Sequence, residues 1–259
     1  MKSNCLNCFP ACVLKEGKPV KKKRWIIPIV LILIAAAAFC IYVSDCYHAD
    51  DAALEALGSD GNVKIEETGY GWFFDGPSDD TVLVFYPGGK VEETAYAPML
   101  DEIACEGMDV CLVKMPFRLA VLGSSRAEGV LERYDGYQNR YIGGHSLGAV
   151  VAGIYAAEHD LDGVIMFAGY PDRNVDEPVL MIYGSEDGVI RMDKVSAADQ
   201  YGKVEKVIIE GGNHAGFGNY GDQKGDGQAR ITSVEQQAAA VQAIFGWLTE
   251  KQDAGILIN

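Results

Sequence analysis

The order of apolar and polar residues along the chain predicts a mostly parallel β-sheet covered by helices. Short apolar runs rich in valine and isoleucine, such as TVLVFY, GVIMFAG and PVLMIYG, alternate with segments of helical periodicity. Strands that read as continuous apolar runs are typical of a sheet with both faces buried. We therefore expect an α/β domain over residues 62–259, with a mostly parallel central sheet and helices on both faces.

The individual elements follow from the same pattern. A hairpin over NVKIEET and YGWFF precedes the strand TVLVFY, the helix AYAPMLDEIACEG and the strand DVCLVKMPF. A helix near GVLERYDGY, the strand RYIGG and a helix from Leu147 to about His159 come next. The strands GVIMFAG, PVLMIYG and VEKVIIEGG and a final helix SVEQQAAAVQAIFGWLTE complete the expected domain. Residues 44–61 are expected to be a polar juxtamembrane tether with a short helix.

One segment near the N-terminus is apolar throughout. Trp25 to Val43 carries no charge, and as a helix it would measure about 28 Å, close to the thickness of a bilayer core. Residues 1–24 carry seven basic side chains and one acidic one, so the positive-inside rule predicts a cytoplasmic tail at 1–24, a transmembrane helix at 25–43 and an extracytoplasmic domain in the cell membrane. A signal-anchor is favoured over a cleaved signal peptide and over a buried core helix, although Ala35 to Ala38 supply the small residues of a cleavage region.

Charge and cysteine content exclude several classes of function. The net charge is −15, and no basic stripe interleaved with aromatic residues follows residue 24, so no nucleic-acid partner is expected. Cys5, Cys8 and Cys12 offer three thiolates, one fewer than a structural zinc site requires, and they have no nearby histidine. The glycine-rich run at 216–229 contains Asp222 and Asp226 but lacks the spacing of a calcium loop. We expect neither a metal nor a cofactor.

A G-x-S-x-G motif carries the first candidate for chemistry. Gly144 to Gly148 join the predicted strand RYIGG to the helix that begins at Leu147. A tight turn between a strand and a helix projects the serine hydroxyl from the end of the sheet, and flanking glycines leave room for the crowded backbone. Because this context matches the motif, Ser146 is the predicted nucleophile.

Ser146 needs a histidine to remove its proton, and the chain has four. His48 is juxtamembrane, His145 lies within the turn itself, and His159 ends a helix before a charged segment. His214 follows the strand VEKVIIE in the loop GGNHAGFG, which would bring it to the same edge of the sheet. His214 is therefore the predicted base.

A carboxylate must hold the tautomer of that histidine. Asp187 lies between Ser146 and His214 in the sequence, three residues after the strand PVLMIYG ends at Gly184. Glu186 and Asp172 remain rivals for the same role. The order Ser146, Asp187, His214 is that of hydrolases whose serine lies on a strand-to-helix turn.

Two backbone donors are expected to hold the developing oxyanion. Leu147 follows the nucleophile and supplies the first N–H. The strand VLVFY ends in Pro-Gly-Gly, where Gly89 is the preferred second donor and Lys90 comes close behind. Lys90 and Phe117, the latter in the stretch Met115 to Arg118 at the end of the strand DVCLVKMPF, are the predicted substrate-binding residues.

These segments together resemble a known family. The stretches YPGGKVEETAYAPML, VKMPFRLAVL, YIGGHSLGA, IYGSEDGV and GGNHAGFGNYGDQKGDG are similar to the compact fold-5 group of α/β-hydrolases, which is related to dienelactone-hydrolase-like proteins and often membrane-tethered. The resemblance covers about residues 62–250. It implies a hydrolase without defining a substrate. Dienelactone hydrolases use a cysteine where this chain has Ser146.

The sequence thus predicts a serine hydrolase that cleaves a carboxylic ester, or else a thioester or amide, through an acyl-serine intermediate. Its expected partners are a small-molecule ester or acyl substrate and the lipid bilayer around residues 25–43. Two alternatives stay open: an acyltransferase with the same triad, and a catalytically silent binding protein on a hydrolase fold. Only eight residues, Tyr170 to Glu177, separate two predicted strands where many lipases insert a lid, so we also expect an open site that takes short acyl groups.

Overall fold

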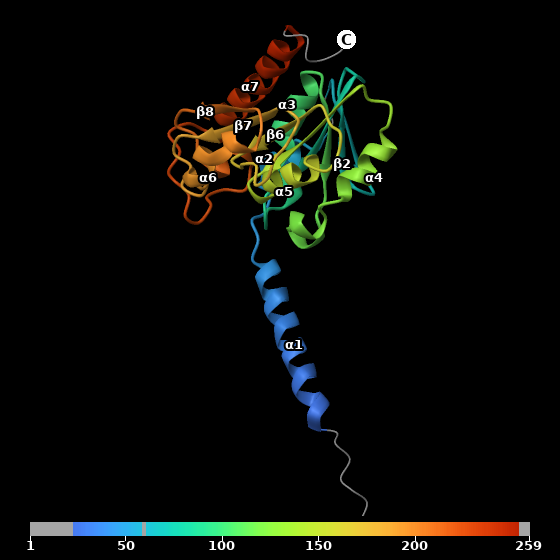
Figure 1. Cartoon of the computed structure of the whole chain (residues 1–259), viewed down its shortest axis with the longest axis vertical. Helices are drawn as coiled ribbons and strands as arrows, with labels where there is room; N and C mark the ends of the chain where they lie inside the picture. Colours follow the sequence, from blue (N-terminus) through green and yellow to red (C-terminus); the bar gives the residue numbers. More distant parts are fainter. Residues whose placement is uncertain (1–22, 59–60, 254–259) are drawn as a thin grey trace, which may run out of the picture. The chain divides into compact units, whose positions relative to one another are not determined.

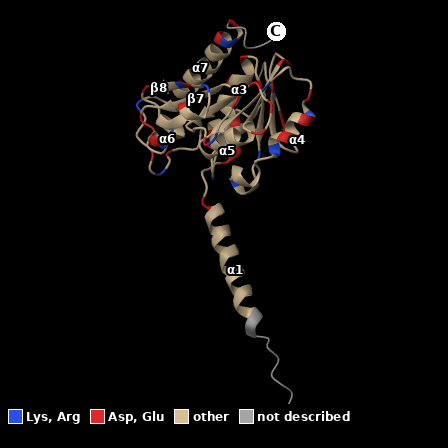
Figure 2. Ribbon diagram, in the orientation of Figure 1, with Lys and Arg blue, Asp and Glu red and all other residues tan. Residues whose placement is uncertain are grey.

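The computed structural model describes residues 23–58 and 61–253 and divides the chain into two units, Met1–Ser44 and Asp45–Asn259. Most of the predicted basic tail, including Cys5, Cys8 and Cys12, lies outside the described residues. In the first unit, α1 (Lys23–Ser44) contains an apolar stretch, Ile26–Ser44, with a mean hydropathy of 2.9 and no buried part. Figure 2 shows no charged residue along the part of α1 drawn in tan. By length and composition this helix can cross a membrane.

The second unit is built on an eight-stranded sheet, and this confirms the predicted α/β architecture (Figure 1). The strand order is β1-β2-β4-β3-β5-β6-β7-β8; β1 and β2 form an antiparallel hairpin, β2 pairs antiparallel with β4, and the other neighbours are parallel. The strands are β1 (Lys64–Thr68), β2 (Gly71–Asp75), β3 (Thr81–Tyr86), β4 (Asp109–Val113), β5 (Asn139–His145), β6 (Gly163–Phe167), β7 (Val179–Gly184) and β8 (Val204–Ile209).

Helices cover both faces of the sheet because the central strands are apolar on both sides. On β3, Leu83 and Phe85 pack into one core cluster, while Val82 and Val84 pack into the other, as the two-residue period of a strand requires. One cluster includes residues of α3 (Ala97–Cys105) and α7 (Ser233–Asp253); the other includes residues of α4 (Arg126–Arg133), α5 (Leu147–Ala156) and α6 (Met192–Ala197).

Two segments bear on expectations from the sequence: residues 44–61 and the connection between β6 and β7. Residues 44–61 were predicted as a polar tether with a short helix. The second unit begins at Asp45 and includes a short helix, α2 (Asp51–Glu55), whose Ala53 is fully buried. The connection from β6 to β7, where no room for a helical lid was expected, contains no helix. Parallel strands align their carboxyl ends at one edge of the sheet, and that edge carries the candidate site.

Candidate active site

Ser146 lies on the sharp turn between β5 and α5. Its backbone has φ 53° and ψ −119°, a strained conformation for a non-glycine residue, and its N–H donates to the Phe167 carbonyl (2.9 Å). The flanking glycines are required by close packing: a Cβ on Gly144 or Gly148 would lie 2.4 Å or 2.2 Å from the Tyr86 carbonyl oxygen. The turn that the motif predicts is therefore present.

His214 and Asp187 form a buried pair at the same edge of the sheet. His214 follows β8 and Asp187 follows β7, and the exposed fractions of their side chains are 1% and 0%. His214 Nδ1 lies 2.9 Å from Asp187 Oδ2, while Asp187 Oδ1 accepts hydrogen bonds from Val189 N–H (2.9 Å) and Ile190 N–H (2.8 Å). Because the carboxylate accepts the Nδ1 proton, Nε2 is left as the basic nitrogen.

The candidate nucleophile and the candidate base line the same cavity. His214 Nε2 is buried and has no hydrogen-bond partner among the described residues. Ser146 and His214 line one cavity of about 260 Å³, so the structure brings them together without a direct hydrogen bond between them. In a free enzyme such a contact is often long and closes only when substrate is bound. The arrangement can move a proton between a hydroxyl and an imidazole.

The two residues predicted to supply the oxyanion donors, Leu147 and Gly89, are close neighbours. Leu147 is the first residue of α5, and a Cβ built on Gly89 would lie 2.9 Å from the Leu147 Cδ2 atom. Lys90 N–H instead donates to the Arg118 carbonyl (2.8 Å), which commits it to a protein partner. Of the two candidates for the second donor, Gly89 is the one that the geometry favours.

Lys90 and Phe117, the predicted substrate-binding residues, do not line the cavity next to Ser146 in the part of the chain that the structure describes. Lys90 Nζ pairs with Asp45 Oδ2 (2.8 Å), and Phe117 is 58% exposed. Apart from Ser146, Leu147 and His214, the sequence reasoning missed the residues that line this cavity. The sequence marks them only by position, because several of them come shortly after the nucleophile or the acid. Besides Ser146 and His214, the lining residues are Leu147, Val150, Ala168, Gly169, Tyr170, Val189, Ile190 and Arg191.

The rival acids lie elsewhere. Glu186 Oε1 pairs with Arg230 (2.6 Å), and Asp172 Oδ1 pairs with Lys194 Nζ (3.2 Å). Both carboxylates therefore have cationic partners of their own. Asp187 is the candidate that contacts His214.

The other histidines also have local partners. His48 Nδ1 lies 3.2 Å from Glu92 Oε2, and the His159 ring stacks on Tyr155 with 3.7 Å between ring centres. Neither lines the cavity that holds Ser146 among the described residues. His145 is buried behind the turn, where its ring centre lies 4.7 Å from that of His214.

Asp226 connects the loops that carry the acid and the base, a role that the sequence analysis did not assign. Its Oδ1 accepts hydrogen bonds from Gly188 N–H (3.1 Å), His214 N–H (3.1 Å) and its neighbour Gly227 N–H (2.8 Å). Its Oδ2 accepts from Ala215 N–H (2.9 Å). One carboxylate thus ties the residue after Asp187 to the backbone of His214.

The segment at 45–50 also contacts the loops of the site. Tyr47 N–H donates to the Lys90 carbonyl (2.8 Å), and the Tyr47 carbonyl accepts from Glu92 N–H (2.9 Å). Farther along, Asp50 N–H donates to the Asn219 carbonyl (2.9 Å) in the histidine loop. The segment therefore bridges the loop after β3 and the loop after β8.

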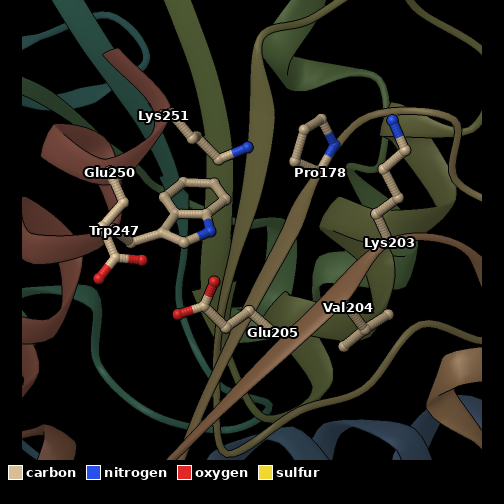
Figure 3. A pocket seen from close by; sticks show the side chains of 7 residues that line it. All are labelled: Pro178, Lys203, Val204, Glu205, Trp247, Glu250 and Lys251. Atoms are coloured by element: carbon tan, nitrogen blue, oxygen red, sulfur yellow. The ribbon is translucent and has the colours of Figure 1, made fainter. Parts of the chain in front are cut away.

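Another cavity, of about 370 Å³, lies at the opposite edge of the sheet (Figure 3). Pro178 and Lys203 directly precede β7 and β8, so this cavity is at the amino ends of the strands, away from Ser146. The same edge carries the described carboxylates whose spacing could suit a cation. Their candidate ligand atoms lie within 4.8 Å of one another, and the residues are Asp75, Asp79 and Asp109.

Comparisons with known proteins agree with this architecture. A model of the alpha/beta hydrolase family matches residues 82–238. The structure of TT1662 from Thermus thermophilus is 17% identical with a TM-score of 0.53, and the match covers 73% of this chain and 99% of that chain. The structure of Est1E from Butyrivibrio proteoclasticus is 13% identical with a TM-score of 0.54, and covers 73% of this chain and 100% of that one. At these identities the likeness shows the fold alone. No curated protein matches the sequence.

Proposed function

The chain belongs to the alpha/beta hydrolase family, and from this membership and the geometry of the site we propose that it is a serine hydrolase that cleaves a carboxylic ester. The observation that carries the proposal is the hydrogen bonding of the two ring nitrogens of His214. Its Nδ1 is held by the buried Asp187 carboxylate at 2.9 Å, and its Nε2 is buried and unpartnered within the described residues. His214 and Ser146 line the same cavity. An imidazole in this state is prepared to accept a proton from a serine.

The reaction follows from these positions. Ser146 Oγ attacks the ester carbonyl carbon while its proton passes to His214 Nε2, and Asp187 stabilises the imidazolium. The carbonyl oxygen becomes an oxyanion held by Leu147 N–H and Gly89 N–H. The bond to the alcohol then breaks, and His214 returns the proton to the leaving oxygen. Water repeats the sequence on the acyl-serine and releases the acid.

The size of the cavity favours a small acyl or alcohol group. About 260 Å³ lies just below the usual range for small-molecule sites, roughly 300–1,000 Å³, and the surface of the cavity is more apolar than polar. The β6–β7 connection holds no helix that could close over the site. We expect ordinary saturation with soluble short-chain esters and no jump in rate when the substrate forms micelles, because no lid has to open.

We also propose that residues 25–43 anchor the enzyme in the cell membrane, with residues 1–24 in the cytoplasm and the catalytic unit outside. The apolar stretch of α1 and the basic side chains before it support this orientation. Protease added to intact cells should then digest the catalytic unit and spare the N-terminal tail. Protection of the catalytic unit with digestion of the tail would reverse the orientation.

Labelling with a fluorophosphonate probe tests the proposed chemistry directly. Only a serine activated by a base reacts readily with such a probe. The full-length chain in detergent should be labelled at Ser146, and the Ser146→Ala variant should not be labelled. A panel of p-nitrophenyl esters of increasing acyl length then measures the substrate preference. A wild-type chain that neither takes the probe nor cleaves any ester would contradict the proposed function.

A further inference from the structure

A second buried histidine connects the loops around the site. His145 Nδ1 lies 2.8 Å from the Tyr96 hydroxyl, and His145 Nε2 lies 3.0 Å from the carbonyl oxygen of His214. The same tyrosine hydroxyl accepts a hydrogen bond from Gly88 N–H (3.0 Å). Tyr96 and His145 are both completely buried. The resulting chain of hydrogen bonds runs from Gly88 to His214, and the mechanism above uses neither side chain in it.

The direction of each hydrogen bond in this chain follows from its ends. The His214 carbonyl can only accept, so His145 Nε2 carries a proton and donates it. Burial lowers the pKa of His145 well below its ordinary value, which keeps the ring neutral and leaves Nδ1 as an acceptor. The Tyr96 hydroxyl therefore donates to Nδ1 while it accepts from Gly88 N–H. Each donor in this chain meets one acceptor, and reversing any bond would break a neighbouring one.

These bonds join three segments that are distant in the sequence. Gly88 directly precedes the oxyanion donor Gly89, His145 directly precedes Ser146, and the His214 carbonyl belongs to the base itself. The contact is tight, because a Cβ built on Gly88 would lie 2.7 Å from both His145 Nδ1 and the Tyr96 hydroxyl oxygen. A glycine is therefore required where the oxyanion loop crosses the Tyr96–His145 bond.

We propose that Tyr96 and His145 are positioning residues that fix the oxyanion loop and the base loop relative to Ser146, through the chain Gly88 N–H to Tyr96 to His145 to the His214 carbonyl. This inference rests on the proposed function for its effect on turnover, because neither side chain touches the substrate cavity in the described residues. Loss of the chain should displace Gly89 N–H or His214 Nε2 and so lower the rate of the chemical step more than substrate binding.

Tyr86 offers a matched control on the other side of the sheet. It is also completely buried, and its hydroxyl also combines one accepted and one donated bond, from Ala127 N–H (2.9 Å) and to the Ser124 carbonyl (2.7 Å). In the full-length chain, Tyr96→Phe should lower kcat about tenfold to a hundredfold with KM unchanged. Tyr86→Phe should lower the unfolding temperature about as much as Tyr96→Phe does, but it should leave kcat unchanged.

His145 provides a rescue experiment. Glutamine presents an N–H donor and a carbonyl acceptor, so His145→Gln can keep both bonds and should retain most of the wild-type kcat. His145→Leu keeps the bulk, removes both bonds and should lose activity to the same extent as Tyr96→Phe. Combining Tyr96→Phe with His145→Leu should cost little more than either change alone, because both break one chain.

An NMR measurement without substrate separates this inference from the proposed function. With ¹⁵N-labelled histidine in the full-length chain, His145 should show the Nε2–H tautomer, and Tyr96→Phe should shift the His214 ring signals while Tyr86→Phe leaves them in place. If the wild type cleaves no ester but the His214 signals respond in this way, the proposed function fails and the positioning role stands. Unchanged His214 signals, or equal kcat in the two tyrosine variants, would overturn the positioning role.

Discussion

The two edges of the parallel sheet hold buried ionisable groups in different states of hydrogen bonding. At the amino end of β4, Asp109 is fully buried, and its two carboxylate oxygens accept from Gly76 N–H and the Tyr137 hydroxyl. At the carboxyl ends, His214 is as deeply buried, yet its Nε2 has no partner among the described residues. Leaving a buried polar atom without a hydrogen bond costs free energy, so the unpaired Nε2 of His214 needs an explanation.

The comparison teaches that burial alone does not mark a functional group. The Tyr141 hydroxyl is also buried and has no hydrogen-bond partner in the described part of the chain, but its ring packs on Trp247, which lines the cavity at the opposite edge. The unpaired nitrogen of His214 differs because a serine on a strained turn lines the same cavity. Substitutions at the carboxyl edge should therefore affect turnover, and substitutions at the amino edge should affect stability.

The largest expected effect is at Ser146 and His214. Ser146→Ala and His214→Gln should each lower kcat by roughly 10⁴-fold or more, and the double variant should cost little more because the residues act as a unit. Ester turnover measures the loss, and thermal unfolding of Ser146→Ala should match the wild type. Substantial residual turnover in Ser146→Ala would place the nucleophile elsewhere.

Asp187→Asn should be severe but smaller, at about 10³-fold to 10⁴-fold in kcat. An amide nitrogen cannot accept the Nδ1 proton of His214, so the ring is pushed towards the wrong tautomer. Glu186→Gln and Asp172→Asn are matched controls, since both carboxylates have cationic partners of their own. Full activity in Asp187→Asn together with loss in either control would reassign the acid.

Asp226→Asn should lower kcat by about tenfold to a hundredfold. The carboxylate accepts four backbone N–H groups, and an amide nitrogen in place of one oxygen would face a donor. The acid and base loops would then shift relative to each other. Asp222→Asn, an exposed neighbour in the same run, is the control and should leave kcat unchanged. Equal kcat in the two variants would contradict the role of Asp226.

Much of the fold could be predicted from the sequence because burial on both faces leaves a strong pattern. Every strand of the predicted domain is present, and the errors are at the ends of elements: β4 stops at Val113 although the apolar pattern continues to Phe117, and α5 stops at Ala156 before His159. The short helix α6, which was not predicted, has a single buried residue, Val195, and so leaves almost no periodic signal.

The candidate site could be predicted only in part, for a physical reason. Ser146, Asp187 and His214 each lie within five residues of the carboxyl end of a parallel strand, so the order of strands already brings them to one edge. Asp226 lies 12 residues beyond His214, and its contacts depend on how a loop folds back. Lys90 and Phe117 have φ of 62° and 53°, a left-handed conformation that no sequence signal marks for these residue types.

At the amino edge, Asp109→Asn should change stability and its pH dependence while leaving kcat unchanged. Burial raises the pKa of Asp109 above its ordinary 3.8, so the folded state binds more protons than the unfolded state as pH rises from 3.8. Wild-type stability relative to the asparagine variant should therefore be greatest at low pH and fall as pH rises through the folded-state pKa. Urea unfolding of both proteins across this range measures the difference. A difference that grows with pH would contradict the raised pKa.

The smallest expected effect is at Lys251, whose side chain lies beside Trp247 in the amino-edge cavity (Figure 3). Its Nζ is 4.2 Å from the centre of the Trp247 ring, and burial lowers the pKa of this lysine below 10.5. Lys251→Met keeps an unbranched side chain over the ring. The variant loses a cation–π contact of about 0.5–1 kcal/mol but also removes a partly desolvated charge, so the free energy of unfolding should change by less than about 1 kcal/mol at pH 7.

Because the pKa of Lys251 is lowered in the folded state, the folded state binds fewer protons than the unfolded state below pH 10.5, and wild-type stability relative to the methionine variant should rise between pH 7 and 10. Urea unfolding at both pH values measures the change, with ester turnover alongside. A stability difference that is flat with pH would mean that the lysine is not desolvated, and an altered kcat would show that the amino edge also acts on catalysis.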